Sequence, residues 1–367
     1  MRYTIPLSYN PINSKKLTEV LIRYEDVLHN QLVTDFEGEM IRFTGSPHAV
    51  ALNSGTAAIH LALKVLGVGP GDYVIAPTFT YVASINPVLY LGAQPILIDS
   101  EPTTWNMDPD LLKEAIEELK AEDKRPKALL LVHTYGMPAQ LDKLLEIAKK
   151  EDIPVVEDAA ESLGSTYQGK MVGTFGHIGI YSFNNNKVIT TYGGGILVTE
   201  NQEWASKARF LASQSRENLP YYEHAEIGYN YAMGPLNAAY GLSQIPDLQI
   251  NINGRRWIFE RYLEKFENSG LVYPTELPGM VSNRWFSTFL FRDGATKNHV
   301  TSVLAAQGIE TRPLWNPMHR QPLFKGVGNY RSNVSDSQFE KGLCLPSGQV
   351  LSDEELNTIV AIIKDEI

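Results

Sequence analysis

The sequence predicts an α/β protein whose main sheet is largely parallel. Short apolar runs alternate with amphipathic stretches through the first two-thirds of the chain. Strands separated by helices of this length need crossover connections, which place neighbouring strands parallel. After about Gln244 the alternation stops. We therefore expect a large α/β domain over 1–244, including an N-terminal arm, and a smaller C-terminal α+β domain over 245–367.

The elements of the large domain follow from these periodicities. Continuous apolar runs of three to five residues predict buried strands at 49–52, 73–76, 95–99, 128–132 and 154–156. Apolar residues at helical spacing predict helices at 57–63, 82–91, 108–119 and 141–150. Asp108 and Pro109 suit the N-cap and first turn of the third helix, and Pro87 suggests a kink in the second. In the smaller domain we expect helices at 255–266 and 352–363 and an antiparallel strand at 285–291.

The composition is that of a globular protein, with 43% hydrophobic and 20% charged residues among 367. A net charge of −10 argues against nucleic acid or an anionic membrane as partner. The eight histidines show no zinc-ligand spacing, so no metal is expected. The single cysteine, the lack of an apolar signal core in 1–6 and the lack of a 20-residue apolar run predict a cytoplasmic protein.

Lys187 and Asp158 suggest the chemistry. Lys187 lies between an apolar strand and the glycines 193–195, which permit close approach of the backbone. Asp158 ends the run Val155–Asp158, and its neighbour Glu157 must point to the opposite face of that strand. An amine held for a carbonyl and an acid held for a pyridine nitrogen are the pairing that pyridoxal 5′-phosphate (PLP) requires. We read His133 as a structural histidine.

Other candidate residues also follow strands, where parallel sheets collect ligands. Ser54, Gly55, Thr56 and Ala57 lie at a strand-to-helix turn, which is either a phosphate cradle or a plain capping turn. Ser182 follows another strand and could add a hydroxyl to the same phosphate. Tyr81, after the strand at 73–76, could stack on a flat ring or pack in the core.

Together these residues resemble the DegT/StrS family of PLP-dependent sugar aminotransferases, over nearly the whole chain from Asn53 to Gly348. The resemblance implies fold type I, which is the aspartate-aminotransferase architecture, and a homodimer with active sites at the subunit interface. It makes Lys187 the lysine that joins the cofactor and moves protons, and Asp158 the partner of the ring nitrogen. It places Glu161 near the ring hydroxyl and Tyr81 on the ring. The implied phosphate ligands are Gly55, Thr56, Ala57, Ser182 and Asn230 of the partner subunit.

Within the family the chain looks most like the 4-aminotransferases that act on UDP-2-acetamido-2,6-dideoxy-4-keto-hexose in bacillosamine-type pathways. The similarity rests on segments 184–195, 282–285, 310–315 and 318–319. L-Glutamate would be the donor, with pyridoxamine phosphate as the aminated cofactor and 2-oxoglutarate as co-product. The chain departs from the family's usual sequence at two positions. It has Gly193 where many relatives carry glutamate, and Ala232 where arginine is frequent.

Arg312 and His319 are candidates for binding the nucleotide sugar, because a guanidinium suits pyrophosphate oxygens; an interdomain structural role is the alternative. Other nucleotide-linked keto sugars, whether 3-keto, GDP-linked or dTDP-linked, remain open as substrates. A sugar dehydratase of the family would often replace the lysine with histidine, and Lys187 argues against it. A non-catalytic binding protein would be favoured by loss of Lys187 or Asp158, and both are present.

Overall fold

The computed structural model describes residues 3–25 and 30–367. Met1 and Arg2, which begin the segment used above to argue against a signal peptide, lie outside the described residues.

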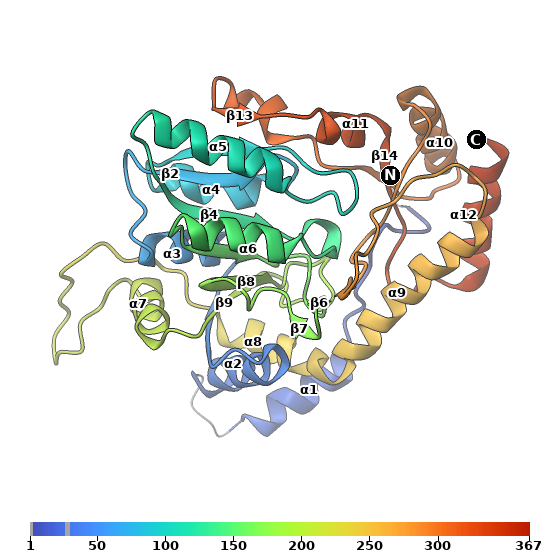
Figure 1. Ribbon diagram of the computed structural model, residues 1–367. Helices are drawn as coiled ribbons and strands as arrows, with labels where there is room; N and C mark the ends of the chain where they lie inside the picture. Colours follow the sequence, from blue (N-terminus) through green and yellow to red (C-terminus); the bar gives the residue numbers. More distant parts are fainter. Residues whose placement is uncertain (1–2, 26–29) are drawn as a thin grey trace.

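A single large sheet organises the part of the chain that the structure describes (Figure 1). In spatial order its eight strands are β1 (His48–Leu52), β9 (Gly195–Thr199), β8 (Ile178–Ser182), β5 (Val155–Asp158), β4 (Pro126–Val132), β2 (Tyr73–Pro77), β3 (Gln94–Ile98) and β13 (Asn329–Tyr330). The strands from β8 to β13 are parallel, whereas β9 is antiparallel to both of its neighbours. The expected, mainly parallel sheet is confirmed.

Helices cover both faces of this sheet, because successive side chains of a strand point to opposite sides. In β4, Leu129 and Leu131 join one hydrophobic core, and Ala128 and Leu130 join the other. The first core is closed by α2 (Asn30–Thr44), α5 (Pro109–Ala121), α6 (Leu141–Lys150) and α8 (Pro235–Gln244). The second is closed by α3 (Gly55–Val65), α4 (Val82–Tyr90) and α7 (Gln202–Ala212). The continuous apolar runs of the strands are thus explained by burial on both faces.

The C-terminal part has a third core of its own, beside the large sheet (Figure 1). Its helices are α9 (Leu248–Lys265), α10 (Gly294–Ala306) and α12 (Asp353–Asp365), and its antiparallel sheet contains β11 (Ser287–Leu290), β14 (Gly342–Leu345) and β12 (Arg312–Pro313). The strand expected at 285–291 is therefore present as β11. Ile5 of the N-terminal arm joins this core, and β13 belongs to the large sheet. A boundary near residue 245 stays a prediction.

Several short elements not described so far were also not expected from the sequence. They are α1 (Ser14–Arg23), α11 (Val334–Lys341), and the small sheet of β10 (Met280–Val281), β6 (Thr166–Tyr167) and β7 (Lys170–Met171). Two-residue strands carry no measurable periodicity, so a pattern search cannot find them.

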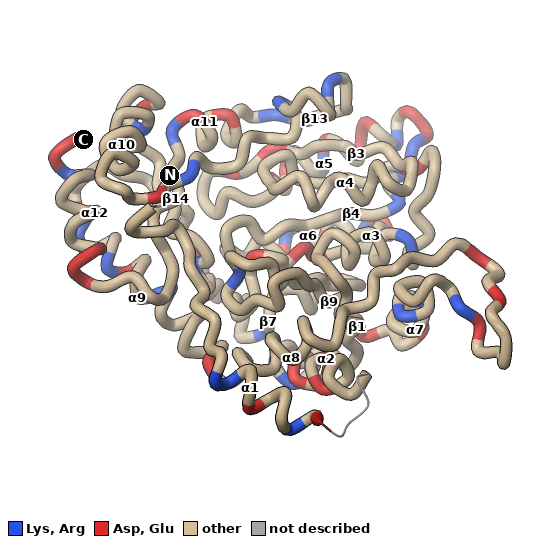
Figure 2. The backbone as a smooth tube through the Cα atoms, turned by 180° about the vertical axis from the view of Figure 1, so that it is seen from behind, with Lys and Arg blue, Asp and Glu red and all other residues tan. Residues whose placement is uncertain are grey.

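Charged residues lie mostly on the outer helices and loops, while the central strands are largely uncharged (Figure 2). Within residues 3–25 and 30–367, no helix combines the length and apolar character that crossing a bilayer requires.

Candidate active site

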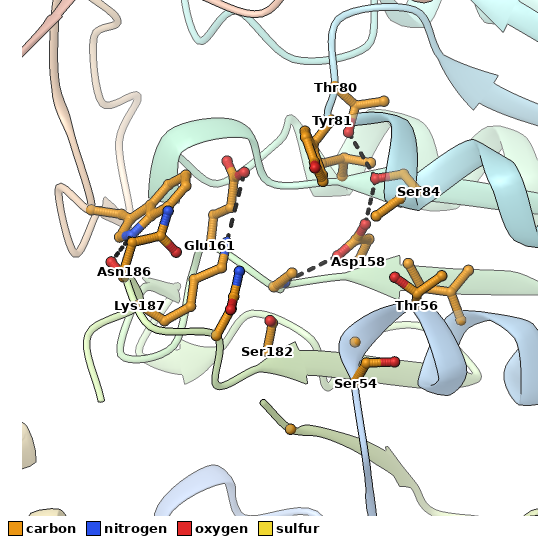
Figure 3. A pocket seen from close by; sticks show the side chains of 18 of the residues that line it. Ser54, Thr56, Thr80, Tyr81, Ser84, Asp158, Glu161, Ser182, Asn186 and Lys187 are labelled. Atoms are coloured by element: carbon orange, nitrogen blue, oxygen red, sulfur yellow. Dashed lines mark hydrogen bonds and ion pairs between the residues drawn. The ribbon is translucent and has the colours of Figure 1, made fainter. Parts of the chain in front are cut away.

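A cavity of about 450 Å³ opens where β1, β2, β5 and β8 end (Figure 3). Parallel strands bring their carboxyl ends to the same edge of a sheet, so residues distant in the chain meet there. Gly55, Thr56, Tyr81, Asp158, Glu161, Ser182 and Lys187 line this cavity. Seven of the site residues expected from the sequence are thus brought together.

The N-terminus of α3 forms one wall of the cavity. Ser54 caps the helix, and its Oγ accepts the amide hydrogen of Ala57 at 3.1 Å. The amides of Gly55 and Thr56 have no hydrogen-bond acceptor within the described residues, as is usual for the first turn of a helix. A Cβ added at Gly55 would lie only 3.1 Å from the Cβ of Ser182. Two free amides beside a hydroxyl form an anion site.

Asp158 ends β5 with its carboxylate buried in the cavity. Its Oδ2 accepts the hydroxyl hydrogen of Ser84 at 2.7 Å, and its Oδ1 accepts the amide of Ala160 at 3.1 Å. Ser84 Oγ lies 2.8 Å from Thr80 Oγ1, so a chain of hydroxyls fixes the carboxylate (Figure 3). Burial raises the pKa of Asp158 above its usual value, and the bonds from Ser84 and Ala160 oppose this.

Glu157 points to the other side of the strand, as its position next to Asp158 requires. It accepts a hydrogen bond from His133 Nε2 at 3.0 Å and further bonds from the amides of Gly173, Phe175 and Gly176. Burial alone would raise its pKa, but these donors outweigh it and lower the pKa. His133 Nδ1 accepts the amide of Ala139 at 3.0 Å. The structural interpretation of His133 is consistent with these bonds.

Lys187 extends its amine across the cavity toward Glu161. Nζ lies 3.9 Å from Glu161 Oε1 and 3.8 Å from the centroid of the Trp285 ring. Burial lowers the pKa of Lys187, and the nearby carboxylates oppose this. Burial raises the pKa of Glu161 to about 7, against the opposing effects of Lys187 and of the Tyr135 amide, which donates to Oε2 at 2.6 Å. A lysine with a lowered pKa is the form that attacks a carbonyl.

The loop before Lys187 is fixed by segments far away in the chain. Asn10 Nδ2 donates to the carbonyl of Asn185 at 3.0 Å and to that of Lys187 at 2.7 Å. Trp285 Nε1 donates to the carbonyl of Asn186 at 2.9 Å (Figure 3). The N-terminal arm and the C-terminal part together therefore set the position of the lysine.

An aromatic wall completes the site and was not recognised as functional from the sequence. Tyr135 stacks between Trp285 and Trp315, at centroid distances of 6.3 and 5.5 Å, and Trp315 packs against Tyr81 at 5.2 Å. Trp285 and Trp315 belong to the segments 282–285 and 310–315 that carry the family resemblance, whereas nothing in the sequence separates Tyr135 from a core residue. Ser84 was also missed, although a serine near the start of a largely apolar helix could have been noticed.

Four expected site residues lie outside this cavity. Ala57 is not a lining residue, and its amide is already bonded to Ser54. Asn230 is exposed, which leaves its expected role toward a partner subunit a prediction. Arg312 is exposed and pairs with Glu310 at 2.6 Å. His319 bonds Thr78 Oγ1 at 2.8 Å and Asp336 at 3.0 Å, one through each ring nitrogen, so it joins the C-terminal segment to the end of β2.

The polar groups that line the cavity match one kind of ligand. Free amides and a hydroxyl suit a phosphate, a poised amine suits an aldehyde, and a buried carboxylate with spare acceptor sites suits a ring N–H. Tyr81, with its ring half-exposed at the mouth, offers a flat face. The residues present therefore fit PLP.

Comparison with known proteins agrees with this fit. A model of the DegT/DnrJ/EryC1/StrS aminotransferase family matches residues 13–364. The chain is 44% identical over 337 residues to EpsN of Bacillus subtilis, named as a candidate PLP-dependent aminotransferase, covering 90% of this chain and 87% of that one. It is 34% identical to the GDP-perosamine synthase of Caulobacter vibrioides, covering 90% and 89%.

A solved structure has the same fold. It is the PLP form of a candidate sugar aminotransferase from Streptococcus pneumoniae, with a TM-score of 0.90 at 28% identity, covering 99% of this chain and 98% of that one. The likeness confirms the expected fold type I.

Proposed function

Because the chain belongs to the DegT/DnrJ/EryC1/StrS aminotransferase family, we propose that it aminates the C4 ketone of a UDP-linked 2-acetamido-2,6-dideoxy-4-keto-hexose, using L-glutamate as donor. The chain is an enzyme and uses PLP, as this family does. The single observation that carries the proposal is the meeting of Lys187, Asp158 and the amino end of α3 in one cavity.

The cofactor would be held at three points. The amides of Gly55 and Thr56 and the hydroxyl of Ser182 would bind its phosphate. Asp158 would accept the ring N–H, and Tyr81 would cover the ring. Glu161 would lie near the ring hydroxyl. When bound, PLP supplies an electron sink that makes the hydrogen on the donor's Cα acidic.

The residues of the chain would then orient and move protons. Lys187 would bind the carbonyl carbon of the cofactor and, once displaced, carry a proton from the donor's Cα. Burial lowers its pKa, which favours the unprotonated amine that a base requires. Asp158 would stabilise positive charge on the ring nitrogen, because a buried carboxylate favours a nearby cation. The same steps in reverse would aminate the sugar.

The substrate identity is supported by the segments 184–195, 282–285 and 310–315, which look like those of the UDP-sugar 4-aminotransferases. All three segments supply cavity residues, among them Asn186, Trp285 and Trp315. A GDP-linked keto sugar is the second candidate, since a relative of 34% identity is named a GDP-perosamine synthase. Arg312 is proposed to contact the pyrophosphate when its exposed guanidinium meets a ligand.

We further propose that the enzyme works as a homodimer in the cytoplasm. The exposed position of Asn230 supports its reaching the phosphate site of a neighbouring subunit. The cytoplasmic setting is supported by Cys344, which is buried and forms no disulfide.

The decisive experiment presents the enzyme with L-glutamate and a panel of UDP-, GDP- and dTDP-linked keto sugars. Mass spectrometry and proton NMR then identify the amine and its ring position. We expect a 4-amino UDP sugar and an equal amount of 2-oxoglutarate, with no product from Lys187→Ala. A product formed only from GDP sugars would favour the second candidate, and amination at C3 would contradict the regiochemistry.

A further inference from the structure

Arg255 is a fully buried arginine without an acidic partner. It lies on α9, and its Nη1 donates to the carbonyl of Trp285 at 2.7 Å and to that of Ser347 at 3.3 Å. Its Nη2 donates to Ser8 Oγ at 3.0 Å. Within the described residues the guanidinium has no salt-bridge partner, and Nε has no hydrogen-bond acceptor. Burial lowers the pKa of Arg255 to about 10, so it remains a cation at neutral pH.

Burying an uncompensated charge is costly, because neutral acceptors replace only part of the water that a cation loses. A neutral side chain of similar length could fill the same space with a smaller loss of solvation free energy. A buried charge kept without a counter-ion therefore indicates a role that needs the charge itself.

The partners of Arg255 connect it to the reactive lysine. Trp285 and Ser8, which accept its hydrogen bonds, both donate to the carbonyl of Asn186, at 2.9 Å and 3.4 Å. Asn186 directly precedes Lys187, and the ring of Trp285 lies 3.8 Å from Nζ. Arg255 thus bonds the backbone of Trp285 and the hydroxyl of Ser8, two of the residues that hold the lysine loop.

Three charged groups act on the amine of Lys187. Glu161 and Asp158 are acidic and favour its protonated form, whereas Arg255 is the cation that favours the neutral form. A like charge disfavours protonation, so Arg255 offsets the two acids that the cofactor site requires.

We propose that Arg255 is a positioning residue for Lys187, holding the lysine loop through Trp285 and Ser8 and placing an uncompensated positive charge near the amine. The inference rests on the proposed function, because it concerns the lysine that carries the cofactor. A purely structural residue would stabilise the junction of α9, β11 and the arm but would not affect titration at the lysine.

The test is a pH titration of the visible absorbance of the holoenzyme. Arg255→Met should move the midpoint measurably upward, because it removes a like charge that disfavours protonation. Arg255→Lys, which keeps the charge, should stay close to the wild type. Arg256→Met is the matched control, since it removes the same charge from the next residue of α9, and its midpoint should not change.

The outcomes separate failure of the proposed function from failure of the role assigned to Arg255. A wild-type protein with no visible band, or one that glutamate does not bleach, would contradict the proposed function. A normal band with equal midpoints for Arg255→Met and Arg256→Met would overturn the role of Arg255 alone. If Arg255→Met does not fold, Arg255→Gln replaces it, since its amide can still donate to Trp285. If neither neutral variant folds, Arg255 serves the fold and the proposal is wrong.

Discussion

Replacing Gly55 with alanine should weaken cofactor binding without weakening the fold. The new Cβ would lie 3.1 Å from Ser182 Cβ and 3.4 Å from its Oγ, so the two segments must separate by a few tenths of an ångström. Alanine is favoured over glycine in a helix by up to about 1 kcal/mol, which offsets this crowding. The unfolding free energy should therefore change little.

The phosphate site should be affected much more. Displacing the Ser182 hydroxyl removes one hydrogen bond to a charged group, worth about 1.5–3 kcal/mol. That energy corresponds to a rise in the Kd for PLP of roughly 10- to 150-fold. The assay is a titration of the cofactor-free protein with PLP, followed by the visible absorbance.

Gly69→Ala is the matched control, because a Cβ at Gly69 meets no atom within 4 Å. Its Kd should equal that of the wild type. If Gly55→Ala also binds PLP within twofold of the wild type, the hydroxyl and the helix terminus do not form the phosphate site, and the reasoning fails.

Three further predictions concern the lysine, a buried histidine and a crowded glycine. Lys187→Ala should abolish turnover and the visible band; multiple turnovers by this variant would contradict the assignment. Burial lowers the pKa of His60 to about 4 from 6.5, so only the unfolded chain gains its proton between these values. The free energy of unfolding should therefore fall by at most about 3 kcal/mol as the pH drops from 6.5 to 4. Urea unfolding at several pH values measures this loss, which should be smaller in His60→Gln. A Cβ at Gly179 would lie 1.7 Å from the carbonyl oxygen of Gly173, so Gly179→Ala should cost about 3 kcal/mol or more in thermal unfolding.

The sequence predicted the residues whose place follows from strand ends. Lys187, Asp158 and Ser182 all stand at or after apolar runs, and the geometry of a parallel sheet is enough to bring them together. It missed Arg255, which it gave only as the first residue of the helix expected at 255–266. That residue is buried because the arm and the C-terminal strands close over it, and contacts across more than 200 residues leave no local pattern.

The two adjacent acids show how bonding capacity separates a structural carboxylate from a binding one. A carboxylate has about four acceptor positions. Glu157 fills them with His133 Nε2 and three amides, so it has no capacity for a ligand. Asp158 accepts only from Ser84 and Ala160 within the described residues, although it too is buried. Asp158 lines the cavity that also contains Lys187. An acid with open acceptor positions in a cavity can accept a further donor, so we expect Asp158 rather than Glu157 to accept the ring N–H of the cofactor.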